Sequence, residues 1–483
     1  MPKPTARSSP GKSRLAEARS TTLAAKEPLS VCINTQTPLI QFLALPQKLE
    51  LRPPIDGTSE MEGLVEGVDY RFSPGGVTRM VFPLVRRLLH SGVLGDAHWI
   101  SLNPTAPPTM RFQGVTLHSL GLDAERMANY GRVKESIWGT LHGLDTALPD
   151  DEVFWSTDFS DYGYYNRITA ERMRALDREN DFDLFYVHDF QQLPVGGMLE
   201  TLKPKLFRWH IPFDETQIPE PWRERLSSYF NSYDVVVVST RRYLAELKRF
   251  GHTGTSRTIY PYIDPADYTR PAPEAAQATC RKFGLAPTDP FILVVGRMDP
   301  MKGQDRAIRA FEEVARSRPE LRLVLVGNGS FSSSGSGMGL SKSANWRAKL
   351  EALVRSLDLR DRVIFTGHVP QPELDGLYER CRFTVLPSVR EGFGLVVVEG
   401  WIHDKPVIVT DRAGVAELIK DGSNGMVFDP DRPDGLVGKM EKLLDSDSLC
   451  RKLGREGART ARLCSIEAAA LAEAELFGDL VES

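Results

Sequence analysis

Two glutamates in one short stretch have the residue type and spacing best suited to chemistry in this chain. In "PSVREGFGLVVVEGW", residues 387–401, Glu391 and Glu399 are eight positions apart, and an almost wholly apolar run leads to the second. A buried apolar segment does not tolerate a charge without a compensating contact or a function. Each carboxylate can accept hydrogen bonds from paired hydroxyls, so the pair suits a ligand that carries hydroxyls at both ends.

The secondary structure of this run decides how far apart the two carboxylates lie. Gly392 and Gly394 let the backbone approach a ligand closely and favour a helix start, whose free N–H groups attract phosphate. The β-branched "LVVV" that follows favours a strand, so helix and strand both stay open. In a helix the carboxylates would lie up to about 12 Å apart, which resembles the span from hexose to ribose in a nucleotide sugar. For Glu399 alone, a structural role with a satisfied partner is the alternative.

Two cations follow another strand-like run, in "VVGRMDPMKG", residues 294–303. Arg297 comes directly after the run and Lys302 five residues later. A forked arginine and a point-charge lysine at one strand end suit a diphosphate. The alternative is a surface pair that bridges to Asp299 and Asp305.

The first half of the chain also places polar residues at strand ends. "YVHDFQQLP" carries His188 and Asp189, and "FRWHIPFDE" carries Arg208 and His210. In open α/β sheets, ligands gather on loops at the carboxyl ends of strands. A capped or core histidine is the alternative for either ring.

Weaker signals lie in two further loops. In "RFSPGGVTRM", Gly75 and Gly76 precede a helical pattern and could face the same ligand from the other side. In "FTGHVPQPEL", the backbone near Val369 could read a nucleobase edge.

The elements that must position these residues alternate along the chain. Buried strand-like runs such as "FDLFYVHD" and "PFILVVGR" are separated by helical patterns such as "KGQDRAIRAFEEVARS". This order predicts parallel sheets covered on both faces, in two Rossmann-like, doubly wound α/β domains that face each other across a cleft. We expect a disordered basic tail at 1–28, a first Rossmann-like domain at 29–265, a second at 266–460 and a final helix at 461–483; the resemblance described below implies that the first binds the acceptor and the second the donor.

Composition excludes several classes of protein. The 483 residues hold 60 basic and 64 acidic side chains, so the chain lacks the basic excess of a general nucleic-acid binder. No apolar stretch reaches the roughly 20 residues of a membrane span. Five scattered cysteines argue against a disulfide framework and fit a reducing, cytoplasmic compartment. The sequence does not decide between a monomer and a homodimer.

Two segments have no assigned role. The Gly/Ser-rich loop at 327–345 follows a strand end and is either a surface insertion or an active-site lid. The segment 125–149 is either a solvated helix or part of an acceptor site, with Lys134 a candidate for a charged acceptor.

Together these motifs resemble a known family. "GRMDPMKG" and "EGFGLVVVE" resemble the R-x4-K and E-x7-E signatures of the family-four retaining glycosyltransferases, which have the GT-B fold. "SPGGVTRMV" resembles that family's Gly-Gly loop, and the resemblance covers roughly residues 65–440. "VHDFQQLPVG" followed by "RWHIPFDE" is most similar to the glycosyltransferring trehalose synthase branch. The segment 125–149 has no counterpart in the general family pattern, and the alanine-rich final helix leaves its crossing between domains open.

The resemblance implies roles for the candidate residues. Glu391 and His188 would contact the donor sugar, Glu399 the ribose, and Arg297 and Lys302 the leaving diphosphate. The remaining donor contacts would come from Gly75, Gly76, Val369, Gly392, Phe393, Gly394 and Leu395, and the acceptor contacts from Asp189, Arg208 and His210.

The expected activity is retaining transfer of a hexosyl group, such as glucose from UDP- or ADP-glucose, to a small sugar or polyol. No metal or other cofactor is implied; the expected partners are these two small molecules, without nucleic acid or an integral membrane segment, and a homodimer stays open. A trehalose phosphorylase of the same fold and a non-catalytic nucleotide-binding regulator are the two alternatives.

Overall fold

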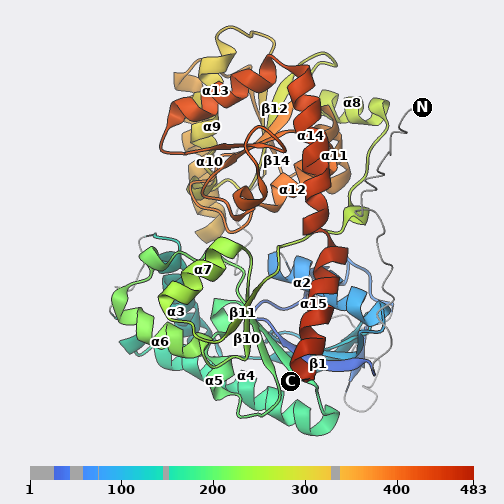
Figure 1. Cartoon of the computed structure of the whole chain (residues 1–483), viewed down its shortest axis with the longest axis vertical. Coiled ribbons are helices and arrows are strands. Elements are labelled where there is room, and N and C mark those ends of the chain that lie inside the picture. Colours follow the sequence, from blue (N-terminus) through green and yellow to red (C-terminus); the bar gives the residue numbers. More distant parts are fainter. Residues whose placement is uncertain are drawn as a thin grey trace, which may run out of the picture.

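The chain folds into two α/β lobes, which a computed structural model describes and Figure 1 shows one above the other. Each lobe has its own sheet, and the two sheets share no strand. The residues that the structure describes are 27–43, 58–61, 63–73, 76–144, 152–327 and 338–482. The expected tail and the Gly/Ser-rich stretch 328–337 lie largely or wholly outside them.

The amino-terminal lobe is built on a nine-stranded sheet in the order β11-β10-β9-β8-β1-β5-β7-β6-β3. All its neighbouring strands run parallel except β6 and β7, which are antiparallel. The strands are β1 (Leu29–Asn34), β3 (Ser59–Glu60), β5 (Leu94–Leu102), β6 (Thr109–Phe112), β7 (Val115–Leu120), β8 (Leu184–His188), β9 (Lys205–Arg208), β10 (Val235–Val238) and β11 (Thr255–Thr258). A separate ribbon pairs β2 (Ile40–Phe42) with β4 (Tyr70–Phe72).

Apolar residues on alternate positions bury both faces of this sheet. In the all-valine β10, Val236 and Val238 join one core, and Val235 and Val237 join the other. Such fully buried runs are typical of parallel strands covered on both sides. The helices of this lobe are α2 (Gly76–His90), α3 (Ala124–Leu141), α4 (Phe159–Asn180), α5 (Val195–Met198), α6 (Glu220–Phe230) and α7 (Arg241–Phe250).

The carboxyl-terminal lobe is built on a six-stranded parallel sheet in the order β14-β13-β12-β15-β16-β17. Its strands are β12 (Phe291–Val295), β13 (Arg322–Val326), β14 (Val363–Gly367), β15 (Phe383–Leu386), β16 (Val407–Thr410) and β17 (Met426–Phe428). Its helices are α8 (Pro273–Lys282), α9 (Gln304–Ala315), α10 (Met338–Ser356), α11 (Gln371–Arg380), α12 (Leu395–Ile402), α13 (Pro433–Leu444) and α14 (Asp447–Ala461). The predicted doubly wound α/β architecture is confirmed.

The last helix, α15 (Ile466–Val481), crosses back and packs in the amino-terminal lobe, beside α2 (Figure 1). Ile466, Ala474 and Phe477 lie in the same core as strand β1 and helix α2. At the crossing point, the amide of Ile263 donates to the Cys464 carbonyl and the amide of Ile466 donates to the Ile263 carbonyl. Alanines in place of aromatics do not prevent the crossing, because small side chains also pack closely.

Two local predictions need correction. The stretch "LPVGGMLETL", residues 193–202, predicts a helix from sequence, but α5 ends after four residues at Met198. A Cβ on Gly196 would lie 2.5 Å from Tyr233, so close packing against α6's end fixes this turn. The segment 125–149 is not a wholly solvated helix, because α3 buries seven residues, among them Tyr130 and Ile137. None of the helices in the described part of the chain is both long enough and apolar enough for a membrane span.

Candidate active site

The strand order of the carboxyl-terminal sheet creates a site between β12 and β15. From β12 the chain adds β13 and β14 on one side, and then returns to add β15, β16 and β17 on the other. The loops that leave β12 and β15 therefore diverge to opposite faces, and such switch points open a crevice at the strand ends where ligands bind. Arg297 and Lys302 follow β12, and Glu391 follows β15, so topology brings these predicted residues together.

Lys302 and Glu391 form an ion pair at this point. The Nζ of Lys302 lies 2.6 Å from Oε2 of Glu391, and the Ser388 hydroxyl donates to the same oxygen at 3.0 Å. Both side chains keep some exposure, 19% for Lys302 and 14% for Glu391. The pair is thus held by the protein but lies within reach of solvent or a ligand.

Charges around Glu391 keep it ionised. Burial alone would raise the pKa of the Glu391 carboxyl, but the Lys302 ammonium, the Ser388 hydroxyl and the Arg297 guanidinium outweigh burial and lower it. The carbonyl of Arg297 in turn accepts a hydrogen bond from Gln304 Nε2 at 2.6 Å. The loop after β12 therefore presents two cations and the loop after β15 one carboxylate.

Two glycines with positive φ fix the loops. Gly303 has φ +65°, and a Cβ there would lie 2.1 Å from the Pro387 carbonyl oxygen, so the Lys302 turn sits directly on the end of β15. Gly394 has φ +101° and precedes α12. A side chain at position 303 would force the two loops apart, and a Cβ at position 394 would lie 2.7 Å from Leu386.

The apolar run after Gly394 is a helix, which settles the alternative that local propensity left open. Helix α12 covers Leu395–Ile402, and its Val397 and Val398 are buried against Trp401 and β16. Tertiary packing on both sides therefore overrides the strand preference of three consecutive valines. Phe393 is buried in the same cluster, and Leu395 packs against it.

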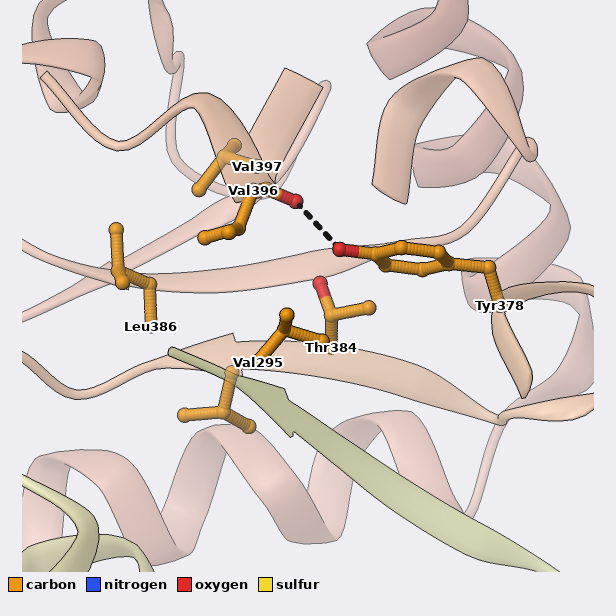
Figure 2. Close-up of a pocket in the computed structure, with 7 residues that line it drawn as sticks. Val295, Tyr378, Thr384, Leu386, Val396 and Val397 are labelled. Carbon is orange, nitrogen blue, oxygen red and sulfur yellow. Dashed lines mark hydrogen bonds between the residues drawn. The ribbon is translucent and has the colours of Figure 1, made fainter. Parts of the chain in front are cut away.

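Glu399, on α12, is held by two tyrosines. The Tyr378 hydroxyl of α11 donates to Oε2 at 2.8 Å, and the Tyr268 hydroxyl donates to Oε1 at 3.3 Å. Figure 2 shows Tyr378 entering a small pocket beneath α12, lined also by Val295, Thr384 and Leu386. The partner that the sequence could not name for Glu399 is this pair of hydroxyls.

The amino-terminal lobe contacts the glycine loop directly. The Tyr243 hydroxyl of α7 donates to the carbonyl of Gly392 at 2.7 Å and lies 3.2 Å from that of Glu391. A Cβ on Gly392 would lie 3.5 Å from the His210 carbonyl oxygen. The loop after β9 and the loop after β15 therefore meet here, as the predicted facing of the two domains requires.

His188 and His210 form a buried pair behind that contact. Nδ1 of His188 and Nε2 of His210 are 3.0 Å apart, and the rings stack with centroids 5.3 Å apart. Burial, followed by the positive charge of Arg208, lowers the pKa of the His188 imidazole well below its usual range. Burial, followed by the neighbouring His188 and then Arg208, lowers the pKa of His210 in the same way, so both rings stay neutral. Nε2 of His188 is buried without a hydrogen-bond partner among the residues that the structure describes.

Asp189, the next residue, sits in an unusual backbone and electrostatic environment. Its φ is +68°, in the region that non-glycine residues rarely adopt. Burial raises the pKa of its carboxyl to about 7, although the amides of Phe190 and His210 lower it in part. Oδ1 is buried, and the described part of the chain offers it no hydrogen-bond partner. Strained, poorly satisfied groups of this kind cluster at functional sites.

Arg208 differs from its predicted role in an acceptor pocket. Its side chain is 1% exposed, and its Nη1 donates to Oε1 of Glu473 on α15. The Tyr186 hydroxyl donates to the same carboxylate oxygen at 2.8 Å. Arg208 therefore bridges β9 to the last helix instead of facing a ligand.

The remaining predicted residues fall in three situations. The Val369 side chain is buried in a core cluster, so only its backbone could meet a ligand. Gly76 is the first residue of α2, as the glycine pair predicted, and Gly75 lies outside the described residues. Lys134 of α3 pairs with Glu135 at 3.3 Å.

Sequence reasoning missed the residues that connect the lobes near this site. Nη2 of Arg390 lies 3.7 Å from Oδ2 of Asp214. A Cβ on Gly143 would lie 3.1 Å from Nη1 of the same arginine. The adjacent His142 has its pKa lowered to about 4 by burial and by the charges of Arg390, Arg297 and Lys302, although its bond to the Trp138 carbonyl opposes this. The end of α3 thus lies near Arg390, Arg297 and Lys302. Only the strand-end position of Tyr243, shortly after β10, could have been flagged in advance.

Comparisons with known proteins agree with this geometry. Residues 277–460 match the family model "Glycosyl transferases group 1", and residues 127–245 match "Trehalose synthase, N-terminal domain". The second match begins within α3, so most of the segment 125–149 falls within the trehalose synthase-type domain and outside the match to the general family model.

Relatives and solved structures extend the comparison to nearly the whole chain. The D-inositol 3-phosphate glycosyltransferase of Acidothermus cellulolyticus is 31% identical over 403 residues, which are 77% of this chain and 78% of the relative. A structure titled trehalose-6-phosphate from E. coli, bound with UDP-2-fluoro glucose, matches with a TM-score of 0.70 at 15% identity, covering 94% of this chain and 99% of that one. The UDP-forming α,α-trehalose-phosphate synthase of Burkholderia xenovorans, in complex with glucose-6-phosphate, matches with a TM-score of 0.68 at 16% identity, covering 93% and 100%.

The fold and the paired strand-end loops define a GT-B glycosyltransferase. The chain belongs to the group 1 glycosyltransferases, and the protein is a hexosyltransferase with a trehalose synthase-type amino-terminal lobe.

Proposed function

We propose that this enzyme transfers a glucosyl group from a nucleoside diphosphate glucose, UDP- or ADP-glucose, to a small sugar or polyol, with retention at the anomeric carbon. The observation that carries the proposal is the meeting of Arg297, Lys302 and Glu391 at the β12/β15 switch point, beneath a glycine loop that the other lobe contacts. In our proposal residues 266–460 hold the donor, residues 29–265 hold the acceptor, and residues 461–483 return to the acceptor side.

The charges suit the departure of a nucleoside diphosphate. The bond from C1 of the glucose to the diphosphate breaks, and negative charge builds on the phosphate oxygens. Preorganised cations at Arg297 and Lys302, with the amides that open α12, stabilise that charge where it develops. The acceptor oxygen bonds to C1 on the same face, and its proton leaves with the diphosphate.

Glu391 has the complementary task in this proposal. It is an ionised carboxylate beside the cations, so it can accept hydrogen bonds from the glucose hydroxyls and orient the sugar. Glu391 also pairs with Lys302, so a bound donor would share these two side chains. Glu399 accepts hydrogen bonds from the ribose, and the neutral His188 offers its unpartnered Nε2 towards the donor sugar.

Asp189 and His210 are the acceptor-side residues of this proposal. The solved structure titled as a trehalose-phosphate synthase in complex with glucose-6-phosphate supports a sugar acceptor. Among the described residues no group of three or more metal-ligating side chains is found. All five cysteines are free, which supports a reducing, cytoplasmic location.

The test is a donor and acceptor screen. UDP-, ADP- and GDP-glucose are each incubated with glucose and related acceptors, and nucleotide release is measured on folded protein. We expect turnover with one nucleotide and product with retained configuration. Phosphate-dependent breakdown of trehalose without nucleotide binding would instead identify a phosphorylase. Nucleotide binding without any turnover would identify a regulator.

A further inference from the structure

The carboxylate of Glu399 is gripped from two directions by elements that are distant in sequence. Tyr378 belongs to α11, and Tyr268 lies in the segment between the end of β11 at Thr258 and the start of α8 at Pro273. This segment joins the two lobes. The two hydroxyls donate to different oxygens, Oε2 at 2.8 Å and Oε1 at 3.3 Å. Two donors on opposite oxygens fix the plane of a carboxylate, which one donor would not do.

Tyr378 is itself held rigidly. Its side chain is fully buried, and its ring stacks on His403 with centroids 5.2 Å apart and an interplanar angle of 8°. Its hydroxyl also lies 3.4 Å from the Val396 carbonyl on α12, the contact drawn in Figure 2. The hydroxyl therefore has little freedom to leave Glu399.

Tyr268 is tied down through its neighbour. Both the amide and the hydroxyl of Thr269 donate to Oδ2 of Asp375, at 2.8 and 2.9 Å. Asp375 lies 3.3 Å from His403, the residue that stacks on Tyr378. The two tyrosines thus belong to one connected network that begins in the linker between the lobes and ends on Glu399.

Both tyrosines stay protonated donors at any ordinary pH. Burial, and then the negative charge of Glu399, raise the pKa of the Tyr268 and Tyr378 hydroxyls. An ionised carboxylate accepts about four hydrogen bonds, so two tyrosine donors do not exhaust its capacity. A vicinal diol, such as the 2′- and 3′-hydroxyls of a ribose, is a ligand that donates a pair of further bonds to such a carboxylate.

We propose that Tyr268 and Tyr378 are positioning residues that hold the Glu399 carboxylate in the orientation that reads the ribose diol of the nucleotide. This inference rests on the proposed function, in which Glu399 binds the ribose. Through Tyr268, the same contact connects the nucleotide site to the segment that joins the lobes. The tyrosines touch no ligand themselves and act through the carboxylate.

The test compares nucleotides that differ only in the diol. Calorimetry measures binding of UDP, 2′-deoxy-UDP and 3′-deoxy-UDP, or the ADP series if the screen selects adenine. The proteins are the wild type, Glu399→Gln, Tyr378→Phe and Tyr268→Phe. Tyr262→Phe is the matched control, because Tyr262 lies in the same linker and its hydroxyl donates to the Met80 carbonyl at 3.1 Å, away from Glu399.

We expect the wild type to prefer the ribonucleotide over both deoxy analogues. Each tyrosine variant should weaken binding of the ribonucleotide by about tenfold, the loss of one hydrogen bond to a charged group, and leave the deoxy analogues almost unchanged. The preference for the diol therefore shrinks in both variants and persists in Tyr262→Phe. A purely structural role would weaken all three nucleotides equally, which would overturn the inference.

The outcomes separate this inference from the proposed function. If the wild type binds no nucleotide, or binds all three equally, the proposed nucleotide site or the ribose role of Glu399 fails first. A second outcome would contradict the positioning role alone. In it, the wild type prefers the ribonucleotide, Glu399→Gln loses that preference, and both tyrosine variants keep it in full. Tyr268 is only partly buried, so Tyr268→Phe remains a folded test even if Tyr378→Phe unfolds, and melting curves check both.

Discussion

Two carboxylate–cation pairs in this molecule have the same chemistry and opposite environments. Glu391 and Lys302 are 14% and 19% exposed and lie between two loops at the β12/β15 switch point. Glu473 and Arg208 are 0% and 1% exposed and join the last helix to β9 in the core of the amino-terminal lobe. The first pair can exchange partners with a ligand, and the second can only be broken by moving α15.

Their protonation follows the same division. The pKa of Glu391 is lowered, because the nearby cations and the Ser388 hydroxyl outweigh burial. The pKa of Glu473 is raised, because burial outweighs Arg208 and the Tyr186 hydroxyl. A buried ion pair of this second kind adds little net stability, but losing one partner leaves an uncompensated charge in the core. The comparison therefore predicts that Lys302 and Glu391 can bind a ligand. It also predicts that removing either Arg208 or Glu473 alone destabilises the fold.

The largest expected effect is on folding. Glu473→Ala strands the Arg208 guanidinium in the core and should lower the free energy of unfolding by about 3–5 kcal/mol in denaturant titrations. The double variant Arg208→Met/Glu473→Leu should recover most of this loss, because no charge remains buried. Glu467→Ala on the same helix is the control, because Glu467 pairs with the exposed Arg87 at 3.5 Å. It should change the free energy of unfolding by less than about 0.5 kcal/mol. Equal effects of Glu473→Ala and Glu467→Ala would erase the distinction between the pairs.

Glu391→Gln should affect turnover and spare the fold. The substitution keeps shape but removes the charge that accepts sugar hydroxyls beside Lys302, so we expect kcat to fall about 10²–10³-fold, the scale for one preorganised electrostatic contact. Steady-state kinetics and melting curves measure the two effects separately. Glu351→Gln, whose carboxylate pairs with Arg347 at 2.9 Å on α10, is the matched control. Full activity in Glu391→Gln would place the reaction elsewhere.

A smaller effect is expected where the lobes touch beside the site. The Glu417 carboxylate accepts the amides of Arg241 and Arg242 at the start of α7, at 3.1 and 3.2 Å, and the Tyr260 hydroxyl at 2.8 Å. It therefore caps a helix of one lobe with a carboxylate of the other, a contact worth about 1 kcal/mol. Glu417→Ala should shift the lobes apart, which small-angle scattering would detect as a larger radius of gyration. An unchanged radius with and without nucleotide would show that Glu417 does not hold the lobes together.

The smallest effect is the pH dependence, and its sign differs between the pairs. Since the folded pKa of Glu391 is lowered, its contribution to stability is present above the unfolded value of about 4.3 and is lost as pH falls through the folded pKa. Since the folded pKa of Glu473 is raised, its contribution is largest below the unfolded value and declines as pH rises towards the folded pKa. As pH rises, the free energy of unfolding of the wild type minus that of Glu391→Gln should therefore increase. The same difference taken against Glu473→Gln should decrease. The same slope for both would contradict the comparison.

The pairing of Lys302 with Glu391 could be predicted from the sequence, and the pairing of Arg208 with Glu473 could not. Arg297, Lys302 and Glu391 stand at strand ends beside glycines, so local pattern and topology bring them together. Arg208 also stands at a strand end, and sequence reasoning gave it a ligand for the same reason. Its true partner lies 265 residues away on an alanine-rich helix whose place no local signal gives.

Contacts between the lobes were equally hidden. Tyr243, Glu417 and Tyr268 are ordinary residues in sequence, and their roles come from the relative placement of two sheets. Local sequence also could not predict the helix at Leu395–Ile402, because valine prefers strands. Packing against β16 and Trp401 overrides that preference. What the sequence predicts here is the fold class and one wall of the site.

The return of α15 to the first lobe has a consequence for how the protein is made. A ribosome that adds about 5–20 residues per second needs roughly 13–53 s to travel the 265 residues from Arg208 to Glu473. For most of that time the strands of the first lobe are already made, but the lobe lacks the helix that packs beside α2 and the Glu473 carboxylate that pairs with Arg208. The second lobe is therefore translated while the first is unfinished, and the apolar side chains that pack against α15 stay uncovered until the final helix arrives.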